Sequence, residues 1–135
     1  MRSPIYTPKG KLSYLVNDDR NQYPVEVELA GDGDKPLEMQ PLLTQQGSVA
    51  TWDAAAGHTA VLYTNDSDPA EIYALENGAL RKLTTHNDAL MAELNLVPTE
   101  DIEFKSKDGT DVHGLLTKPE AFKEGSPVPL SLIHI

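Results

Sequence analysis

The first 84 residues carry short alternations of apolar and polar side chains that are separated by turn residues. In the segment Pro24–Ala30, valine and leucine alternate with glutamate, which predicts a strand with one buried face. The segment Lys11–Asn17 has a similar apolar run, and Asn77-Gly78 separates two more. Asn and Gly both tolerate positive φ, so this pair predicts a tight hairpin. Residues 1–84 are therefore expected to be all β.

A weak internal repeat runs through the same residues. The segment Gly10–Asp18 resembles Gly57–Asp66 at an offset of about 48 residues, and each is followed by a second strand, at Val25–Leu29 and Glu71–Leu75. Such a period is typical of β-propeller blades of about four strands each. We therefore expect residues 1–84 to form two antiparallel sheets packed face to face. The alternative is a small antiparallel sandwich whose strands look alike by chance.

The pattern changes after residue 84 to one with helical spacing. Thr85, with Asp88 three residues later, resembles a capping box, and Pro98 should end the segment. Residues 85–100 are therefore predicted to be a linker with a short helix. The apolar face of this helix consists of Leu90, Met91 and Leu94.

Residues 101–118 predict a second hairpin, which turns at Asp108-Gly109. A two-residue loop would mix polar and apolar side chains on both faces. A three-residue loop with Gly109 at positive φ places Phe104 opposite Val112 and Ile102 opposite Gly114. The hydrophobic pattern selects this second register. The apolar face then consists of Ile102, Phe104, Val112 and Leu116.

Composition narrows the classes of partner. The formal net charge is −10, which argues against nucleic acid or an anionic membrane surface, because both require a basic patch. The sequence has no run of about 18 apolar residues of the kind that spans a membrane. It has no cysteine, which excludes disulfides, thiolate metal sites and a cysteine nucleophile within these residues. Cytoplasmic and periplasmic locations both stay open.

The segment 79–119 resembles the junction between the two domains of prolyl oligopeptidase family serine peptidases, most closely the bacterial dipeptidyl-peptidase and acylaminoacyl-peptidase-like branches. The resemblance implies a mainly β fold class: the last two propeller blades over 1–84, a linker over 85–100, and the truncated start of an α/β-hydrolase domain over 101–135. It implies a parent enzyme that hydrolyses peptides through an acyl-enzyme. The matching residues are Leu83-Thr84, Asn87, Glu100, Ser106, Asp108-Gly109 and Lys118-Pro119.

The sequence departs from the family pattern in two places. No Gly-x-Ser-x-Gly is present, and Leu130–Ile135 ("LSLIHI") stands where the family continues into His-Gly-Gly-Pro. Two interpretations stay open for these six residues: the translation of a sequencing adapter, or a family strand that stops at His134. We expect a fragment that has no catalytic, cofactor-binding or metal-binding residue. The rival functions are a non-enzymatic binding propeller and, more weakly, a free-standing acidic domain that binds a protein.

Other residues with chemical potential have simpler structural interpretations. His113 is expected on an exposed strand face, His58 in a solvated turn and His86 in the linker. Gly31–Asp34 lacks the ligands of a calcium loop and is expected to be a turn. The sequon Asn65–Ser67 matters only in a secreted eukaryotic protein. Trp52 and Tyr63 are expected to pack in the blade core. Asp53 and Asp66 are expected to cap turns.

Overall fold

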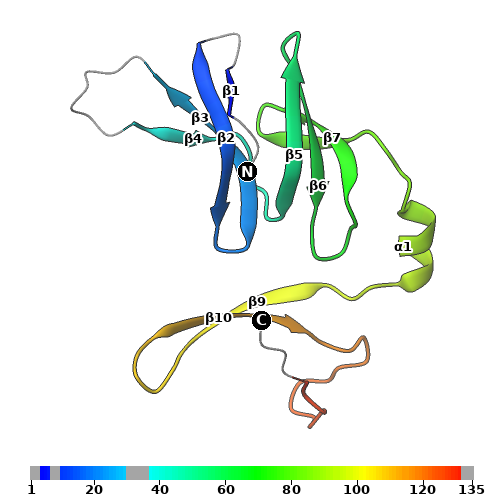
Figure 1. The fold of residues 1–135 in the computed structure, drawn as a ribbon. Coiled ribbons are helices and arrows are strands. Elements are labelled where there is room, and N and C mark those ends of the chain that lie inside the picture. The colour runs from blue at the N-terminus through cyan, green and yellow to red at the C-terminus, as the bar shows by residue number, and fades with distance from the viewer. Residues whose placement is uncertain (1–3, 7–9, 30–36, 132–135) are drawn as a thin grey trace. The chain divides into compact units, whose positions relative to one another are not determined.

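The computed structural model describes residues 4–6, 10–29 and 37–131, and within them the chain is mainly β, as predicted (Figure 1). It divides into two compact units, Met1–Asn95 and Leu96–Ile135. The helix α1 spans Asp88–Leu94. The strands are β1 (Ile5–Tyr6), β2 (Lys11–Asp18), β3 (Asn21–Glu28), β4 (Met39–Pro41), β5 (Ser48–Ala55), β6 (His58–Thr64), β7 (Glu71–Glu76), β8 (Ala79–Lys82), β9 (Thr99–Lys105) and β10 (Asp111–Thr117).

The first unit contains two successive antiparallel meanders, which Figure 1 shows side by side. In the first meander β2 pairs with β1 and β3, and β4 pairs with β3; in the second, β5 to β8 pair in chain order. The repeat detected in the sequence therefore corresponds to equivalent strands, with β2 and β6 second and β3 and β7 third in their meanders. The expected complete separation into two sheets is wrong in one respect. A parallel bridge between Gln22 and Ser48 joins the meanders into one eight-stranded sheet.

The hairpin turn at Asn77-Gly78 follows the prediction. Asn77 has φ +52° and Gly78 has φ +82°, so both central residues are left-handed, as the twist of a two-residue hairpin requires. Ala56 (φ +51°) and Gly57 (φ +82°) connect β5 to β6 in the same way. These turns fix the register of the β5–β6 and β7–β8 pairs, because each allows only one pairing of the strands it joins.

Both meanders contribute side chains to one hydrophobic core. Tyr63 is 1% exposed and meets Tyr73 edge-on, with ring centroids 5.4 Å apart. Leu15 and Tyr23 of the first meander pack against the buried side chains around Tyr63. The core therefore holds the two meanders together, since among the described residues a single ladder bridge links them. Its buried members are Leu43, Val49, Val61 and Tyr63.

The helix α1 forms where the sequence predicts one, but both of its ends differ from the prediction. Asn87, and not Thr85, is the N-cap residue, and no side chain bonds the first turn, so the predicted capping box is wrong. Asn95 ends the helix in the left-handed conformation (φ +46°), before Pro98 is reached. An Asn in this conformation is a common helix terminator because its short polar side chain tolerates positive φ.

The second unit contains the β9–β10 hairpin in the predicted register. Phe104 pairs with Val112, Ile102 pairs with Gly114, and Gly109 has φ +88°. The expected third strand over Leu130–Ile135 falls mostly on residues 132–135, which lie outside the described residues. The Gly31–Asp34 turn lies outside them as well.

Replacing Gly109 with valine should destabilise this hairpin by roughly 1 kcal/mol or more, because a β-branched residue is strained at positive φ. A Cβ at Gly109 would have no atom within 4 Å, so the backbone alone sets the cost. Amide exchange of the β9 and β10 residues measures the effect. Gly109→Asn is the control, since Asn tolerates this conformation better. Equal protection in the two variants would contradict the assignment of the loss to φ.

Candidate functional site

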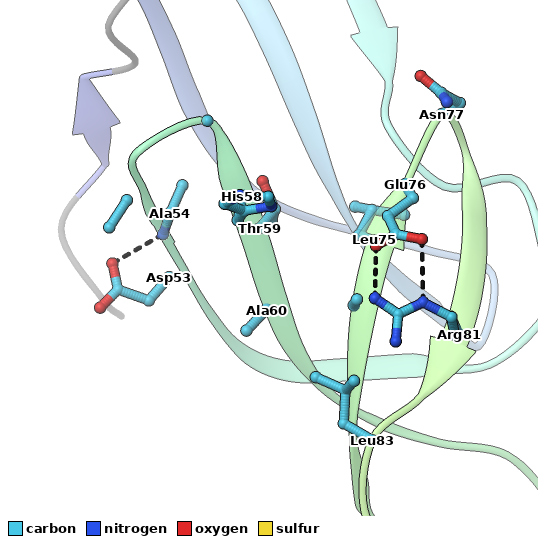
Figure 2. Close-up of a pocket in the computed structure, with 13 residues that line it drawn as sticks. Asp53, Ala54, His58, Thr59, Ala60, Leu75, Glu76, Asn77, Arg81 and Leu83 are labelled. Atoms are coloured by element: carbon cyan, nitrogen blue, oxygen red, sulfur yellow. Dashed lines mark hydrogen bonds and ion pairs between the residues drawn. The ribbon is translucent and has the colours of Figure 1, made fainter.

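A hollow of about 780 Å³ lies against the second meander (Figure 2). Cross-strand pairing places Asp53, Ala60, Ala74 and Arg81 in one row across β5 to β8. The middle of the row is recessed because two of its four side chains are methyl groups, whereas its two ends carry opposite charges. The row could be derived only once the register of all four strands was known.

Arg81 and Glu76, two of the charged groups around the hollow, form an ion pair. The guanidinium of Arg81 donates to both oxygens of Glu76, at 2.6 and 3.1 Å, and this contact lowers the pKa of Glu76 and raises that of Arg81 (Figure 2). Asp53 accepts a bond from the backbone N–H of Ala54 at 2.8 Å. The hollow therefore presents an internally neutralised ion pair above small side chains, which is an arrangement suited to packing and not to acid–base chemistry.

The histidines considered in the sequence lie on three separate elements. His58 begins β6 beside the hollow, His86 is exposed between β8 and α1, and His113 is on β10. His113 Nδ1 lies 3.3 Å from an oxygen of Glu103, its cross-strand partner. His134 lies outside the described residues. Within the described part of the chain, no three His, Asp or Glu side chains gather closely enough to hold a metal ion.

The turn after β6 is closed by an asparagine and not by the aspartate that was expected. Asn65 Oδ1 accepts bonds from the backbone N–H groups of Ser67 and Asp68, at 2.9 and 2.8 Å. This is the role that the sequence assigned to Asp66. The side-chain oxygen of the sequon asparagine is thus used in holding the turn. Trp52 and Tyr63 are core residues, as expected.

One carboxylate is buried at the point where the chain leaves the sheet. Glu71, at the start of β7, is 2% exposed. Its Oε1 accepts bonds from Asn87, from the backbone N–H at 2.8 Å and from Nδ2 at 3.1 Å, while the hydroxyl of Thr84 donates to Oε2. The Thr84 hydrogen bond is the largest cause of a lowered pKa at Glu71 and outweighs burial, which acts in the opposite direction. We call these three residues the Glu71 cluster.

Sequence reasoning missed Glu71, because a glutamate at the start of a strand looks like an exposed residue. Thr84 and Asn87 were noted only as part of the resemblance. The spacing of Thr84 and Asn87 could have pointed to the cluster. Two polar residues three positions apart, just after a strand, can both donate to one carboxylate.

Comparisons with known proteins find a likeness among solved structures. No family model matches the sequence, and no curated protein matches it. Among solved structures, the acylaminoacyl peptidase of Pyrococcus horikoshii matches with a TM-score of 0.67 and 25% sequence identity. The match covers 89% of this chain and 18% of that chain. The described residues contain no helix of the length and apolar character that crossing a bilayer demands.

This match supports the resemblance to prolyl oligopeptidase family peptidases. The match covers 89% of the chain, and the first unit, Met1–Asn95, makes up a smaller share of it than that. The likeness therefore extends into the second unit. The chain is thus mainly β and is similar in structure to part of a peptidase.

Proposed function

We propose that these residues are part of a serine peptidase of the prolyl oligopeptidase family. Residues 1–84 would be two blades of its propeller, 85–100 the linker, and 101–135 the start of its α/β-hydrolase domain. The parent enzyme cleaves peptides through an acyl-enzyme, for which it needs a serine nucleophile, a histidine base and an oxyanion site. All of these groups come from residues that this chain does not contain, and the two blades help to restrict access to them.

One observation carries the proposal. The structural likeness to a peptidase extends beyond the first unit into the residues that hold the β9–β10 hairpin. A binding propeller has no need of this additional hairpin, so the likeness favours the peptidase over its main rival.

The exposed side chains of the hairpin support the same assignment. Phe104 is 54% exposed, and Leu115, which projects from the opposite face, is 50% exposed. An isolated two-stranded hairpin is marginally stable in water. The exposed apolar side chains of this hairpin therefore suit a sheet that continues beyond it, as the first strands of an α/β domain do.

The native gene downstream of Pro129 tests the proposal. The continued reading frame should encode an apolar strand that ends in His-Gly-Gly-Pro or a close variant. Gly-x-Ser-x-Gly, an aspartate and a histidine should follow in that order. A stop codon soon after Pro129, or a long continuation without the serine motif, would favour the binding propeller instead.

Activity provides the second arm of the same test. The complete gene product should release chromophore from an aminoacyl or dipeptidyl substrate, and replacing the motif serine with alanine should reduce kcat by about a thousandfold or more. The 135-residue chain alone should show no turnover above background. If the purified 135-residue chain still turned over substrate after contaminants were removed, the proposal that the catalytic groups lie outside this chain would be wrong.

A further inference from the structure

The chain leaves the second meander through a hydrogen-bonded exit. Beyond the last ladder pair of β7 and β8, the backbone N–H of Leu83 donates to Ile72 O at 2.8 Å. The next acceptor is a side chain: the N–H of Ile72 donates to the Thr84 hydroxyl at 2.9 Å. Thr84 therefore continues the ladder by one bond and, through its own proton, connects it to the carboxylate of Glu71.

The bonds at Glu71 favour an ionised carboxylate. The Thr84 oxygen accepts from Ile72 and donates its own proton to Glu71 Oε2. The backbone N–H of Asn87 can only donate. Glu71 thus receives three hydrogen bonds from groups that are donors in this arrangement. A proton on Oε2 would force the bond with Thr84 to reverse, and it would remove the charge that strengthens all three bonds.

Few other contacts hold the exit segment on the sheet. Lys82 pairs with Asp88, but their side chains are 29% and 49% exposed, and ion pairs of this kind contribute little. Leu90 and Leu94 of α1 are 52% and 51% exposed, so the helix buries little apolar surface. A seven-residue helix is not stable in isolation. The position of α1 therefore depends mainly on the Glu71 cluster.

We propose that Glu71 is a conformational latch, which fixes the segment Leu83–Asn95 to the sheet when it is charged and releases that segment, with the sheet still folded, when it is neutral. The boundary between the two compact units falls directly after this segment, at Asn95. The closed latch therefore keeps the last residues of the first unit on its sheet.

The charges around Glu71 determine when the latch is closed. His86 and Lys82 both favour the ionised form of Glu71, and burial raises the pKa of the nearby Tyr73, so that phenol is neutral near pH 7. The pKa of Glu71 in the folded chain lies below the ordinary carboxyl value of 4.5. The stability that the latch contributes is therefore fully present above that ordinary value, and it is lost as the pH falls through the lowered folded pKa. The latch is closed at neutral pH.

Hydrogen exchange on the 135-residue chain at pH 7 tests the proposal with the variant Glu71→Gln. The reporters for α1 are the amides of Met91 and Asn95, which bond to Asn87 O and Met91 O. Their exchange should become about tenfold or more faster, since a bond to a charged acceptor is lost. Exchange of the Tyr63 amide in β6, and the fluorescence of Trp52, should stay unchanged.

Glu76→Gln is the matched control because it makes the same change on the same strand, at a carboxylate that pairs with Arg81 instead of the exit segment. This control should leave α1 exchange unaltered. The proposal is overturned if α1 keeps its protection in Glu71→Gln. It is also overturned if β6 and α1 lose protection together, because Glu71 would then be an ordinary core residue.

A second pair of variants covers the case in which Glu71→Gln does not fold. Thr84→Val removes the hydroxyl that donates to Glu71, whereas Thr84→Ser keeps it. Thr84→Val should increase α1 exchange by about tenfold, and Thr84→Ser should have a much smaller effect. Equal exchange in these two variants would overturn the proposal without reference to Glu71→Gln.

Discussion

Replacing Gly47 with alanine is expected to destabilise the first unit by roughly 3 kcal/mol or more, through overpacking and backbone strain together. Gly47 has φ +140°, a conformation that other residues seldom adopt. A Cβ at this position would lie 2.5 Å from the Tyr63 hydroxyl oxygen and 2.6 Å from two of its ring carbons. The ring cannot move away easily because Tyr63 is 1% exposed and its hydroxyl donates to Gln46 O.

The position of Gly47 adds to this cost. Its carbonyl accepts a bond from the N–H of Gln22 at 3.1 Å, and its own N–H donates to Asn21 Oδ1 at 2.9 Å. These bonds flank the Gln22–Ser48 bridge that joins the meanders. A displacement at Gly47 therefore disturbs the junction between the meanders as well as the core.

Urea unfolding followed by Trp52 fluorescence measures the loss, and Gly57→Ala is the control. Gly57 is also left-handed, at φ +82°, but a Cβ there would meet nothing within 4 Å. Its replacement should cost only about 1 kcal/mol of backbone strain. If the two alanine variants lose the same free energy of unfolding, the steric explanation for Gly47 is wrong.

The features that the sequence predicted correctly depend on local patterns. Asn77-Gly78 forms its hairpin because the φ preference belongs to the two residues themselves. The register of the second hairpin follows from the alternation around Phe104 and Val112, which only one loop length satisfies. Residue type and short-range spacing contain all of the information that these predictions need.

The features that the sequence did not reveal depend on residues far apart in the chain. Gly47 is required because Tyr63, sixteen positions later, fills the space beside it. The bridge between Gln22 and Ser48 leaves no signal in either strand, since a single pair has no period. The capping box at Thr85 failed for a related reason: Thr84 and Asn87 are fixed by Glu71, so the helix starts after Asn87.

The candidate site shows the same division between local and distant information. The absence of Gly-x-Ser-x-Gly is visible in the sequence, and the expectation of no catalytic residue followed from it directly. The hollow and the Glu71 cluster could not be anticipated, because each combines residues from different strands. In the hollow, only the cross-strand register places Asp53 in the same row as Arg81.

Truncating Tyr63 to alanine should cost about 3–5 kcal/mol, the usual loss for a large core side chain. Its ring is buried against Tyr73 in the cluster that both meanders share. Tyr6→Ala is the control, because Tyr6 is 71% exposed and its loss should change stability by less than about 0.5 kcal/mol. The free energies come from the same urea titrations, and equal losses at the two tyrosines would contradict the assigned core.

Combining the two core changes tests their physical link. In the Tyr63→Ala background the ring atoms that a Cβ at Gly47 would meet are gone, so Gly47→Ala should cost only its backbone strain, about 1 kcal/mol. The two losses should therefore be less than additive by about 2 kcal/mol, within the range observed for residues in direct contact. Gly57→Ala should cost the same free energy of unfolding with Tyr63 present or replaced, because a Cβ at Gly57 would not contact Tyr63. Strict additivity for Gly47 and Tyr63 would mean that the loss at Gly47 arises from its backbone conformation alone, and that the ring does not require glycine at this position.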